Sequence, residues 1–359
     1  MRPGSTAAAR AGRDRALVAE RLQAQLLAGP PARDPVSVVE RLLAVQSQDL
    51  RGARLAIRAR ARGLTASDVD RAMTVDRSLL VTWLNRGTLH LIRAEDYALL
   101  HALTTPPLHT ANARRLAQEG VSRELADRGV KVVERSLSRD GPLTRRRLAE
   151  RLREAGIPTA GQALVHVLMA ASLRGVCVRG PVEGAQHAYV LVRDWLPEPP
   201  SANRSLDRDR ALAELARRYL AGHGPATDRD LARWAGLPLA DARAGLRALA
   251  LELREREDGL AELKGRRLRP ELPPPRLLGP FEPVALGWAS RQPLFGDHDP
   301  LVVSGGLFRP FALVRGRAAA VWSLRGTEVD IRPFRRLAPD DRAALDRDAA
   351  DVVRFLGPS

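Results

Sequence analysis

Two glutamines, Gln46 and Gln48, stand one residue apart, directly after an apolar run with helical spacing over residues 38–45. A carboxamide does not titrate, but it offers one acceptor oxygen and two donor hydrogens. Residues two apart in an extended segment point to the same side, so the two amides could hold one water molecule. The same groups could instead cap the helix or hydrogen-bond inside the core, since an amide buried without a partner is costly. The spacing alone leaves both interpretations open.

A second polar group lies in residues 81–92 (VTWLNRGTLHLI), whose alternation predicts a strand, a turn and a second strand. Arg86 is expected at the tip of this hairpin. Thr88 and His90 alternate with leucines and therefore share one face. Arg86 is open to two interpretations, a solvated turn residue or a contact with a polyanion. His90 fits a hydrogen-bonded structural group better than a catalyst, so we expect it to support its neighbours.

The net charge favours a polyanionic partner. The chain of 359 residues carries 58 Lys and Arg against 42 Asp and Glu, a net charge of +16. GC-rich coding explains why lysine is limited to Lys131 and Lys264, but it does not explain the surplus over acidic residues. Nucleic acid is the first expectation and an acidic membrane surface the second. Because aromatic residues make up only 4%, a stacking platform for single strands is disfavoured, and arginine contacts with duplex phosphates fit better.

Several classes of site lack their motifs in this chain. There is no glycine-rich phosphate loop, no His-Glu-x-x-His and no Gly-x-Ser-x-Gly elbow. Cys177 is the only cysteine, which excludes disulfides and cysteine-rich metal centres. Residues 297–299 (DHD) fit a solvated turn better than a metal site, so we expect neither metal nor cofactor. No signal peptide or membrane-spanning stretch is evident. We expect a soluble, cytoplasmic monomer, associated with the nucleoid and not with a membrane.

An internal echo divides the chain. Residues 141–144 (GPLT) and 224–227 (GPAT) each place a threonine where it can cap a helix. Each is followed by the pattern helix, turn, helix and two-stranded hairpin, the order of a winged-helix unit. A related order of helices precedes the hairpin at residues 83–90. Three tandem winged-helix units are therefore predicted, at residues 1–125, 126–200 and 201–270.

From residue 271 the pattern changes to short apolar runs broken by Gly and Pro, which indicates a small β-barrel or a strongly bent sheet. Pro339, followed by two aspartates, predicts the start of a closing helix. The predicted fold class is α+β, with three tandem winged-helix units followed by a small C-terminal β-barrel and a closing helix in residues 271–359. Strands are expected at residues 284–288, 301–303, 311–314, 319–322 and 329–331.

Four runs carry a resemblance to a known family. They are residues 43–48 (LAVQSQ), 83–91 (WLNRGTLHL), 278–291 (LGPFEPVALGWASR) and 305–310 (GGLFRP). These runs resemble the bacterial tandem winged-helix DNA glycosylases, in the same order and over residues 15–335. Members of that family unhook interstrand crosslinks and excise N7-alkylguanines. The Gln-x-Gln form resembles the branch that protects actinomycetes from their own DNA-alkylating natural products, whereas an Asp in the last position marks a branch with broader substrates.

The resemblance implies that Gln46 and Gln48 are catalytic and hold the attacking water, where ordinary glycoside hydrolysis uses two carboxylates. An N7-alkylguanine already carries positive charge and needs no general acid. Asp49 could act as a supplementary base, although it is expected to face the opposite side. Attack by an amine needs a lysine, and neither lysine lies in a pocket motif, so a monofunctional enzyme is expected. Two residues depart from the family pattern: Ser47 replaces an apolar residue and Glu282 replaces a common Asp.

The expected partner is double-stranded DNA that carries an alkylated guanine. Residues at the hairpin tip, the hairpin flanks and a strand end are the candidates for DNA contacts, namely Arg86, Thr88, His90, Arg174, Arg179 and Arg291. Two rival functions stay open. One is a non-catalytic winged-helix regulator in which the glutamines are structural, and the other is a scaffold that binds protein partners.

Overall fold

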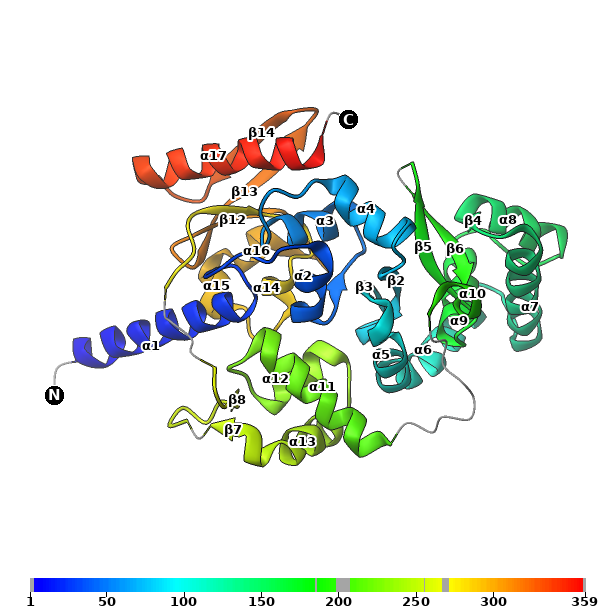
Figure 1. Ribbon diagram of the computed structural model, residues 1–359, viewed down its shortest axis with the longest axis horizontal. Coiled ribbons are helices and arrows are strands. Elements are labelled where there is room, and N and C mark those ends of the chain that lie inside the picture. The colour runs from blue at the N-terminus through cyan, green and yellow to red at the C-terminus, as the bar shows by residue number, and fades with distance from the viewer. Residues whose placement is uncertain (1–2, 185, 198–206, 255, 267–270, 358–359) are drawn as a thin grey trace. The chain divides into compact units, whose positions relative to one another are not determined.

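Two compact units make up the chain. The computed structural model describes residues 3–184, 186–197, 207–254, 256–266 and 271–357. Unit 1 comprises Met1–Val69, Leu212–Trp234 and Pro238–Ser359, and unit 2 comprises Asp70–Ala211 and Ala235–Leu237. The blue and red ends of the ribbon in Figure 1 therefore both belong to unit 1. The predicted segment 1–125 is divided at Val69 in this scheme, while the division into four smaller folding units stays a prediction.

The N-terminal part of unit 1 is a series of capped helices. Asp34 accepts a hydrogen bond from the Ser37 backbone N–H at 2.8 Å, and Pro35 is the first helical residue, a combination that favours a helix start. The helix ends at Leu42, earlier than the predicted end at residue 45. The elements of this part are α1 (Pro3–Ala24), α2 (Pro35–Leu42), β1 (Val45–Gln46), α3 (Leu50–Arg58) and α4 (Ala66–Thr74), the last of which continues into unit 2.

The predicted hairpin opens unit 2. It consists of β2 (Leu79–Leu84) and β3 (Thr88–Arg93), joined by the short η1 (Asn85–Gly87). The strands are antiparallel, and Thr82 lies opposite His90. The register confirms that Thr88 and His90 share one face, because they are two residues apart in one strand. Three helical elements follow, η2 (Ala94–Asp96), α5 (Tyr97–Thr104) and α6 (Pro106–Gln118).

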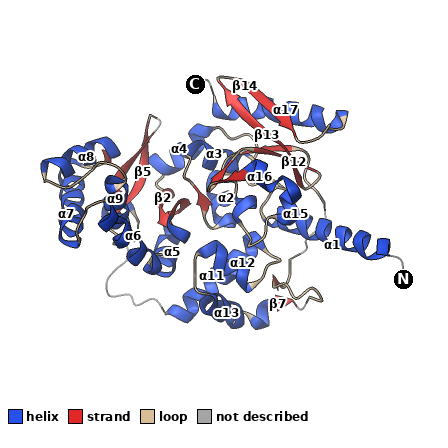
Figure 2. Ribbon diagram, turned by 180° about the vertical axis from the view of Figure 1, so that it is seen from behind, coloured by secondary structure: helices blue, strands red, loops and turns tan. Residues whose placement is uncertain are grey.

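The rest of unit 2 has the element order predicted for residues 126–200. Thr144 caps α8, since its side chain accepts a hydrogen bond from the Arg147 N–H at 3.4 Å. The elements are α7 (Arg123–Asp140), β4 (Leu143–Thr144), α8 (Arg145–Glu154), α9 (Ala163–Leu173), β5 (Cys177–Glu183), β6 (Gln186–Leu191) and α10 (Val192–Trp195). Within unit 2 the strands follow the order β3-β2-β5-β6-β4 (Figure 2). Classifying this part as a winged helix stays a prediction.

A third set of helices begins with α11 (Arg208–His223). Thr227 and Asp230 cap the next helix reciprocally: the Thr227 N–H donates to Asp230 at 2.9 Å, and the Asp230 N–H donates to Thr227 Oγ1 at 3.1 Å. This arrangement is a capping box with Asp in the place of Glu. The remaining elements are α12 (Asp228–Ala235), α13 (Leu239–Ala248), η3 (Ala250–Glu252), β7 (Leu253–Arg254) and β8 (Glu262–Leu263), and the last two pair as the predicted hairpin.

The C-terminal part of unit 1 contains a four-stranded antiparallel sheet in the order β14-β13-β12-β9. Its strands are β9 (Arg276–Leu278), β12 (Phe311–Val314), β13 (Arg317–Arg325) and β14 (Glu328–Pro333), and α17 (Pro339–Leu356) is the predicted closing helix. The order leaves β14 and β9 as two edges, so the sheet is open within the described residues, and closure into a barrel is not observed. Strands 311–314, 319–322 and 329–331 are confirmed.

Two of the expected strands were wrong. Residues 284–288 begin within α14 (Pro283–Leu286), and residues 301–303 overlap α16 (Asp299–Val302). Each helix has a proline at its first or second position, where proline favours a helical start. A run of four apolar residues has no resolvable period, so its length misled the prediction. The other short elements are α15 (Gln292–Phe295), η4 (Gly296–His298), β10 (Val303–Ser304) and β11 (Leu307–Phe308).

None of the helices in the described part of the chain is both long enough and apolar enough to cross a membrane.

Candidate active site

The glutamine motif lies in the connection between α2 and α3. Leu43, with φ at 64°, ends α2 in the left-handed region, and Gln46 follows in β1. Asp49 is the N-cap of α3, so neither Gln46 nor Gln48 occupies a cap position. Gln46 is 7% exposed, whereas Gln48 is open to solvent. One amide is thus held in the protein and the other faces solvent, and their sharing of a face stays a prediction.

Asp49 has a structural role next to the motif. Its side chain accepts hydrogen bonds from the Arg51 N–H at 2.9 Å and the Gly52 N–H at 3.2 Å. These bonds satisfy two of the orphan donors at the start of α3. A carboxylate oxygen held in this way is poorly placed to take a proton from a water. The geometry therefore gives Asp49 the task of fixing the backbone that follows Gln48.

Ser47, between the two glutamines, is 5% exposed, and its Oγ has no hydrogen-bond partner among the described residues. Leaving a buried polar group unsatisfied costs about 1–3 kcal/mol. The position is thus one that an apolar side chain would suit, in agreement with the apolar residue that the family pattern has here. The departure affects packing under the motif and adds no reactive group to it.

The backbone of α3 packs tightly against a segment more than two hundred residues later. A Cβ added to Gly52 would lie 2.6 Å from the Pro280 carbonyl oxygen, and one added to Gly279 would lie 3.0 Å from Leu55 Cβ. Both positions therefore need glycine for close approach. Two of the runs that carry the family resemblance, at residues 43–48 and 278–291, thus meet around the start of α3.

A buried ion pair secures this contact. Arg60 Nη2 lies 2.5 Å from Glu282 Oε1, and both side chains are 0% exposed. The Arg60 guanidinium also donates to the Gln25 carbonyl oxygen, the Gln25 side chain and the Ala56 carbonyl oxygen, at 2.8–3.0 Å. The sequence analysis missed this network, although a glutamate inside the apolar run FEPVAL indicates a paired buried charge. The Glu at position 282, where the family commonly has Asp, reaches its arginine directly.

The hairpin residues of unit 2 have distinct environments. Arg86 has φ at 57° and is half-buried, while the Thr88 hydroxyl donates to the Asn85 carbonyl oxygen at 3.2 Å. His90 is 2% exposed, and its Nδ1 lies 3.0 Å from the Thr88 carbonyl oxygen. Burial, with a smaller contribution from the positive charge of Arg86, lowers the pKa of His90 to about 3. A neutral ring in this position donates from Nδ1 to the carbonyl, which suits the predicted supporting role and leaves it little surface to offer to DNA.

The other three candidate arginines are each engaged with neighbours. Arg179 lies between two rings, 4.7 Å from the centroid of Trp83 and 5.2 Å from that of Tyr189. Such stacking is favourable for a guanidinium. Arg174 is exposed and forms an ion pair of 2.5 Å with Asp127. Exposed pairs of this kind are weak, so Arg174 could exchange Asp127 for a phosphate, whereas Arg179 is fixed in the sheet.

Arg291 pairs with Asp299 at 2.8 Å and lies 5.6 Å from the centroid of the Phe308 ring. Asp299 belongs to the run DHD, in which the His298 ring packs 4.7 Å from that of Phe334. These contacts account for the run as part of the local packing. In the described part of the chain, no group of three or more His, Cys, Asp and Glu is arranged to hold a metal ion.

Three comparisons agree on the relationship of this chain to known proteins. A family model described as DNA glycosylase AlkZ-like matches residues 39–355. A protein of Streptomyces sahachiroi named interstrand DNA cross-link repair glycosylase is 29% identical over 380 residues, covering 96% of this chain and 97% of that protein. The solved structure of Streptomyces sahachiroi DNA glycosylase AlkZ is similar with a TM-score of 0.73 and 27% identity, covering 96% of this chain and 98% of that one. The chain belongs to the AlkZ-like DNA glycosylase family.

Proposed function

We propose that this protein is a monofunctional DNA glycosylase that hydrolyses the N-glycosidic bond of bulky N7-alkylguanines in double-stranded DNA. The observation that carries the proposal is the Gln46-Ser47-Gln48 segment, placed between the two helix caps Leu43 and Asp49. Neither glutamine is used as a cap, which removes the simplest structural explanation for the pair. Membership of a glycosylase family supplies the reaction class.

The proposed chemistry follows from the leaving group. An N7-alkylated guanine is cationic, so its departure requires no proton from a general acid. Gln46 and Gln48 hold a water against C1′ of the sugar, one through a buried amide and the other through an exposed one. Positioning of this kind contributes up to roughly 7–11 kcal/mol in ideal cases. The proton leaves with the water's own hydrogen bonds, since Asp49 is engaged by the Arg51 and Gly52 N–H groups.

We also propose that the substrates include interstrand crosslinks and that the protein serves in resistance to DNA-alkylating natural products. The relative from Streptomyces sahachiroi is named for crosslink repair, and the Gln-x-Gln form of the motif supports the self-resistance branch. The enzyme would act as a monomer on DNA in the cytoplasm. Arg86, Thr88 and Arg174 are the proposed DNA contacts among the candidate residues, because each keeps part of its surface exposed.

The test uses purified protein and a duplex that carries one N7-methylguanine, with release of the free base measured under single-turnover conditions. The variants Gln46→Ala and Gln48→Ala are expected to lose about 10²-fold in release rate, the size of effect that misplacement of a reacting group causes. Binding to the same duplex should persist. The control is Gln162→Ala, which removes an exposed glutamine of unit 2 and should leave release unchanged.

Borohydride added during the reaction should trap no protein–DNA adduct, since the proposed nucleophile is water. Trapping would indicate an amine nucleophile and contradict the proposed mechanism. Salt-dependent DNA binding without release from any alkylated duplex would favour a non-catalytic DNA-binding protein instead.

A further inference from the structure

Unit 1 contains a second charged site that the glutamine motif does not explain. It is a cleft of about 590 Å³ between the end of α3, the segment before β9 and the helix α17. Five arginines line it, namely Arg58, Arg62, Arg276, Arg347 and Arg354. Only two acidic residues, Asp348 and Asp351, face them. The lining therefore has an excess of positive charge.

The two aspartates are already engaged. Arg58, whose side chain is only 2% exposed, pairs with Asp348 and, at 2.9 Å, with Asp351. Asp348 also accepts from the Leu277 backbone N–H at 2.6 Å. Arg354 pairs with Asp351 at 2.7 Å. Both carboxylates thus serve to fix Arg58 and the junction of α17 with β9, and they leave the other arginines of the cleft without a counterion.

Arg276 has an unfulfilled donor at this site. Its Nη1 donates to the Ala59 carbonyl oxygen, but its Nε is buried and has no hydrogen-bond partner among the described residues. Burial lowers the pKa of Arg276, and the nearby positive charges of Arg58, Arg60 and Arg62 act in the same direction, against the field of Asp348. A buried N–H that lacks an acceptor is unfavourable by about 1–3 kcal/mol. A bound anion would supply that acceptor.

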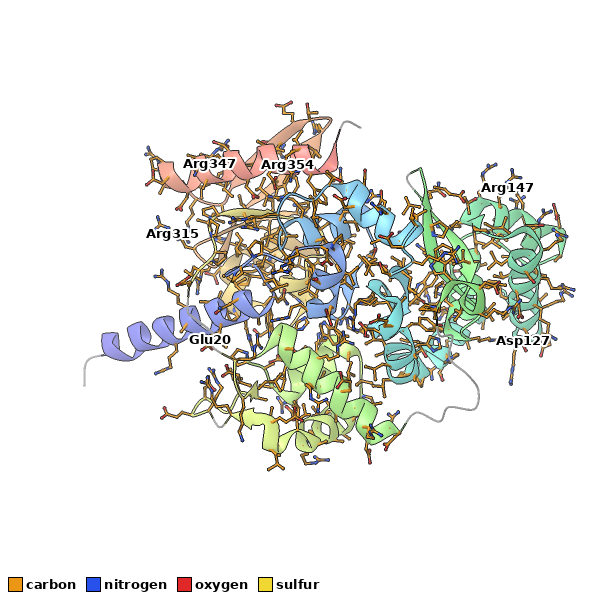
Figure 3. All side chains as sticks on the ribbon, in the orientation of Figure 1. Glu20, Asp127, Arg147, Arg315, Arg347 and Arg354 are labelled. Atoms are coloured by element: carbon orange, nitrogen blue, oxygen red, sulfur yellow. The ribbon has the colours of Figure 1, made fainter. Side chains whose placement is uncertain are left out.

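Two exposed arginines complete the cleft. Arg62 and Arg347 make no hydrogen bond or ion pair within the described part of the chain. Figure 3 shows Arg347 and Arg354 on the same helix, α17. Guanidinium groups bind phosphate oxygens in forked, paired hydrogen bonds. A buried arginine with a free Nε and two unpaired arginines at the rim together make a built site for a phosphate group.

We propose that this cleft binds a backbone phosphodiester of double-stranded DNA. The inference rests on DNA being the substrate of this protein, but it does not depend on the chemistry at Gln46 and Gln48. A phosphodiester carries only acceptor oxygens, which match a lining whose unpaired groups are all donors. Contacts of this type position a protein on a duplex without reading its sequence.

The test compares two double variants that each remove two positive charges. Arg62→Gln with Arg347→Gln changes the rim of the cleft. Arg335→Gln with Arg336→Gln is the matched control, because these exposed arginines of unit 1 lie outside the lining. The dissociation constant of an undamaged 24-base-pair duplex is measured from 50 to 200 mM KCl. Each phosphate contact adds about 0.9 to the slope of log K against log salt.

Loss of one contact should therefore make the change in affinity over this range about 3.5-fold smaller for the cleft variant. The control variant should keep the slope of the wild type. Equal slopes for both double variants, or no change in the cleft variant, would overturn the proposal. Slopes that differ as expected support it even where no alkylated base is released by any of the proteins, so a failure of the proposed glycosylase activity is distinguishable.

A second measurement separates DNA from free phosphate as the occupant. Inorganic phosphate is titrated against chloride at constant ionic strength while thermal unfolding is followed. Stabilisation of the wild type by phosphate that the cleft variant lacks, together with the expected difference in slope, supports a phosphate site occupied by DNA. The same stabilisation with equal DNA slopes means that the cleft takes a free anion only, and the proposal is then wrong.

Discussion

The buried pair of Arg60 and Glu282 offers the sharpest test of how the glutamine motif is supported. Both side chains are 0% exposed, and Glu282 is the only charged partner of the guanidinium among the described residues. Replacing Glu282→Ala leaves a buried cation with three neutral acceptors, two from Gln25 and one from Ala56. Removing one member of a buried ion pair costs about 3–5 kcal/mol. For a unit of this size, such a loss lowers Tm by roughly 6–20 °C.

Shorter and neutral replacements should grade this effect. Glu282→Asp keeps the charge but withdraws it by one carbon–carbon bond, about 1.5 Å. The separation from Arg60 Nη2 would grow from 2.5 Å to beyond hydrogen-bonding distance unless the backbone moves. Glu282→Gln keeps the length and one acceptor but loses the charge. Both variants should therefore be less destabilised than Glu282→Ala.

The assay is thermal unfolding by circular dichroism, paired with base release at a temperature where every variant is folded. Release should fall for Glu282→Ala even in the folded state, because Pro280, two residues earlier, contacts Gly52 at the start of α3. The double variant Arg60→Met with Glu282→Leu removes both charges and should be less destabilised than Glu282→Ala alone. A Tm for Glu282→Ala within 1 °C of the wild type would refute the reasoning.

Three further predictions concern the motif and the hairpin. Asp49→Ala should lower stability by about 0.5–2 kcal/mol through loss of the α3 cap and slow base release, whereas Asp49→Asn, which can still cap, should do less. Ser47→Ala should raise the free energy of unfolding by about 1 kcal/mol in chemical denaturation, because it removes an unsatisfied buried hydroxyl. The folded pKa of His90, about 3, lies below its ordinary 6.5. Its contribution to stability is therefore present above pH 6.5 and lost as pH falls toward 3, at up to about 1.4 kcal/mol per pH unit. His90→Asn should unfold less steeply with acid between pH 6 and 4, as measured by Tm against pH.

Local patterns predicted the elements that local chemistry decides. The Thr144 cap, the hairpin with His90 opposite Thr82, and the strand Phe311–Val314 all follow from side chains within a few residues of one another. The helix Pro283–Leu286 was missed because four apolar residues fit a strand and a helix equally well. Nothing within either run reveals that Gly52 and Pro280 touch, since that contact joins distant parts of the chain.

The same distinction applies to the site. Sequence located Gln46 and Gln48 but could not tell that one is buried and the other exposed, because burial depends on neighbours that the chain brings from elsewhere. It also left Asp49 open as a base, although an Asp directly before a helix is a favoured N-cap. The hydrogen bonds from the Arg51 and Gly52 N–H groups decide for the cap.

A site built on carboxamides requires something different from its fold than a site built on carboxylates. A general base needs a pKa near the working pH, which proteins arrange through burial and neighbouring charge. An amide has no pKa to adjust, so only its position matters. The charged groups near the motif are used accordingly: Asp49 caps α3, and Glu282 with Arg60 fixes the segment packed against that helix. The buried charges of unit 1 around the motif thus hold backbone in place, and the proposed chemistry is left to neutral groups.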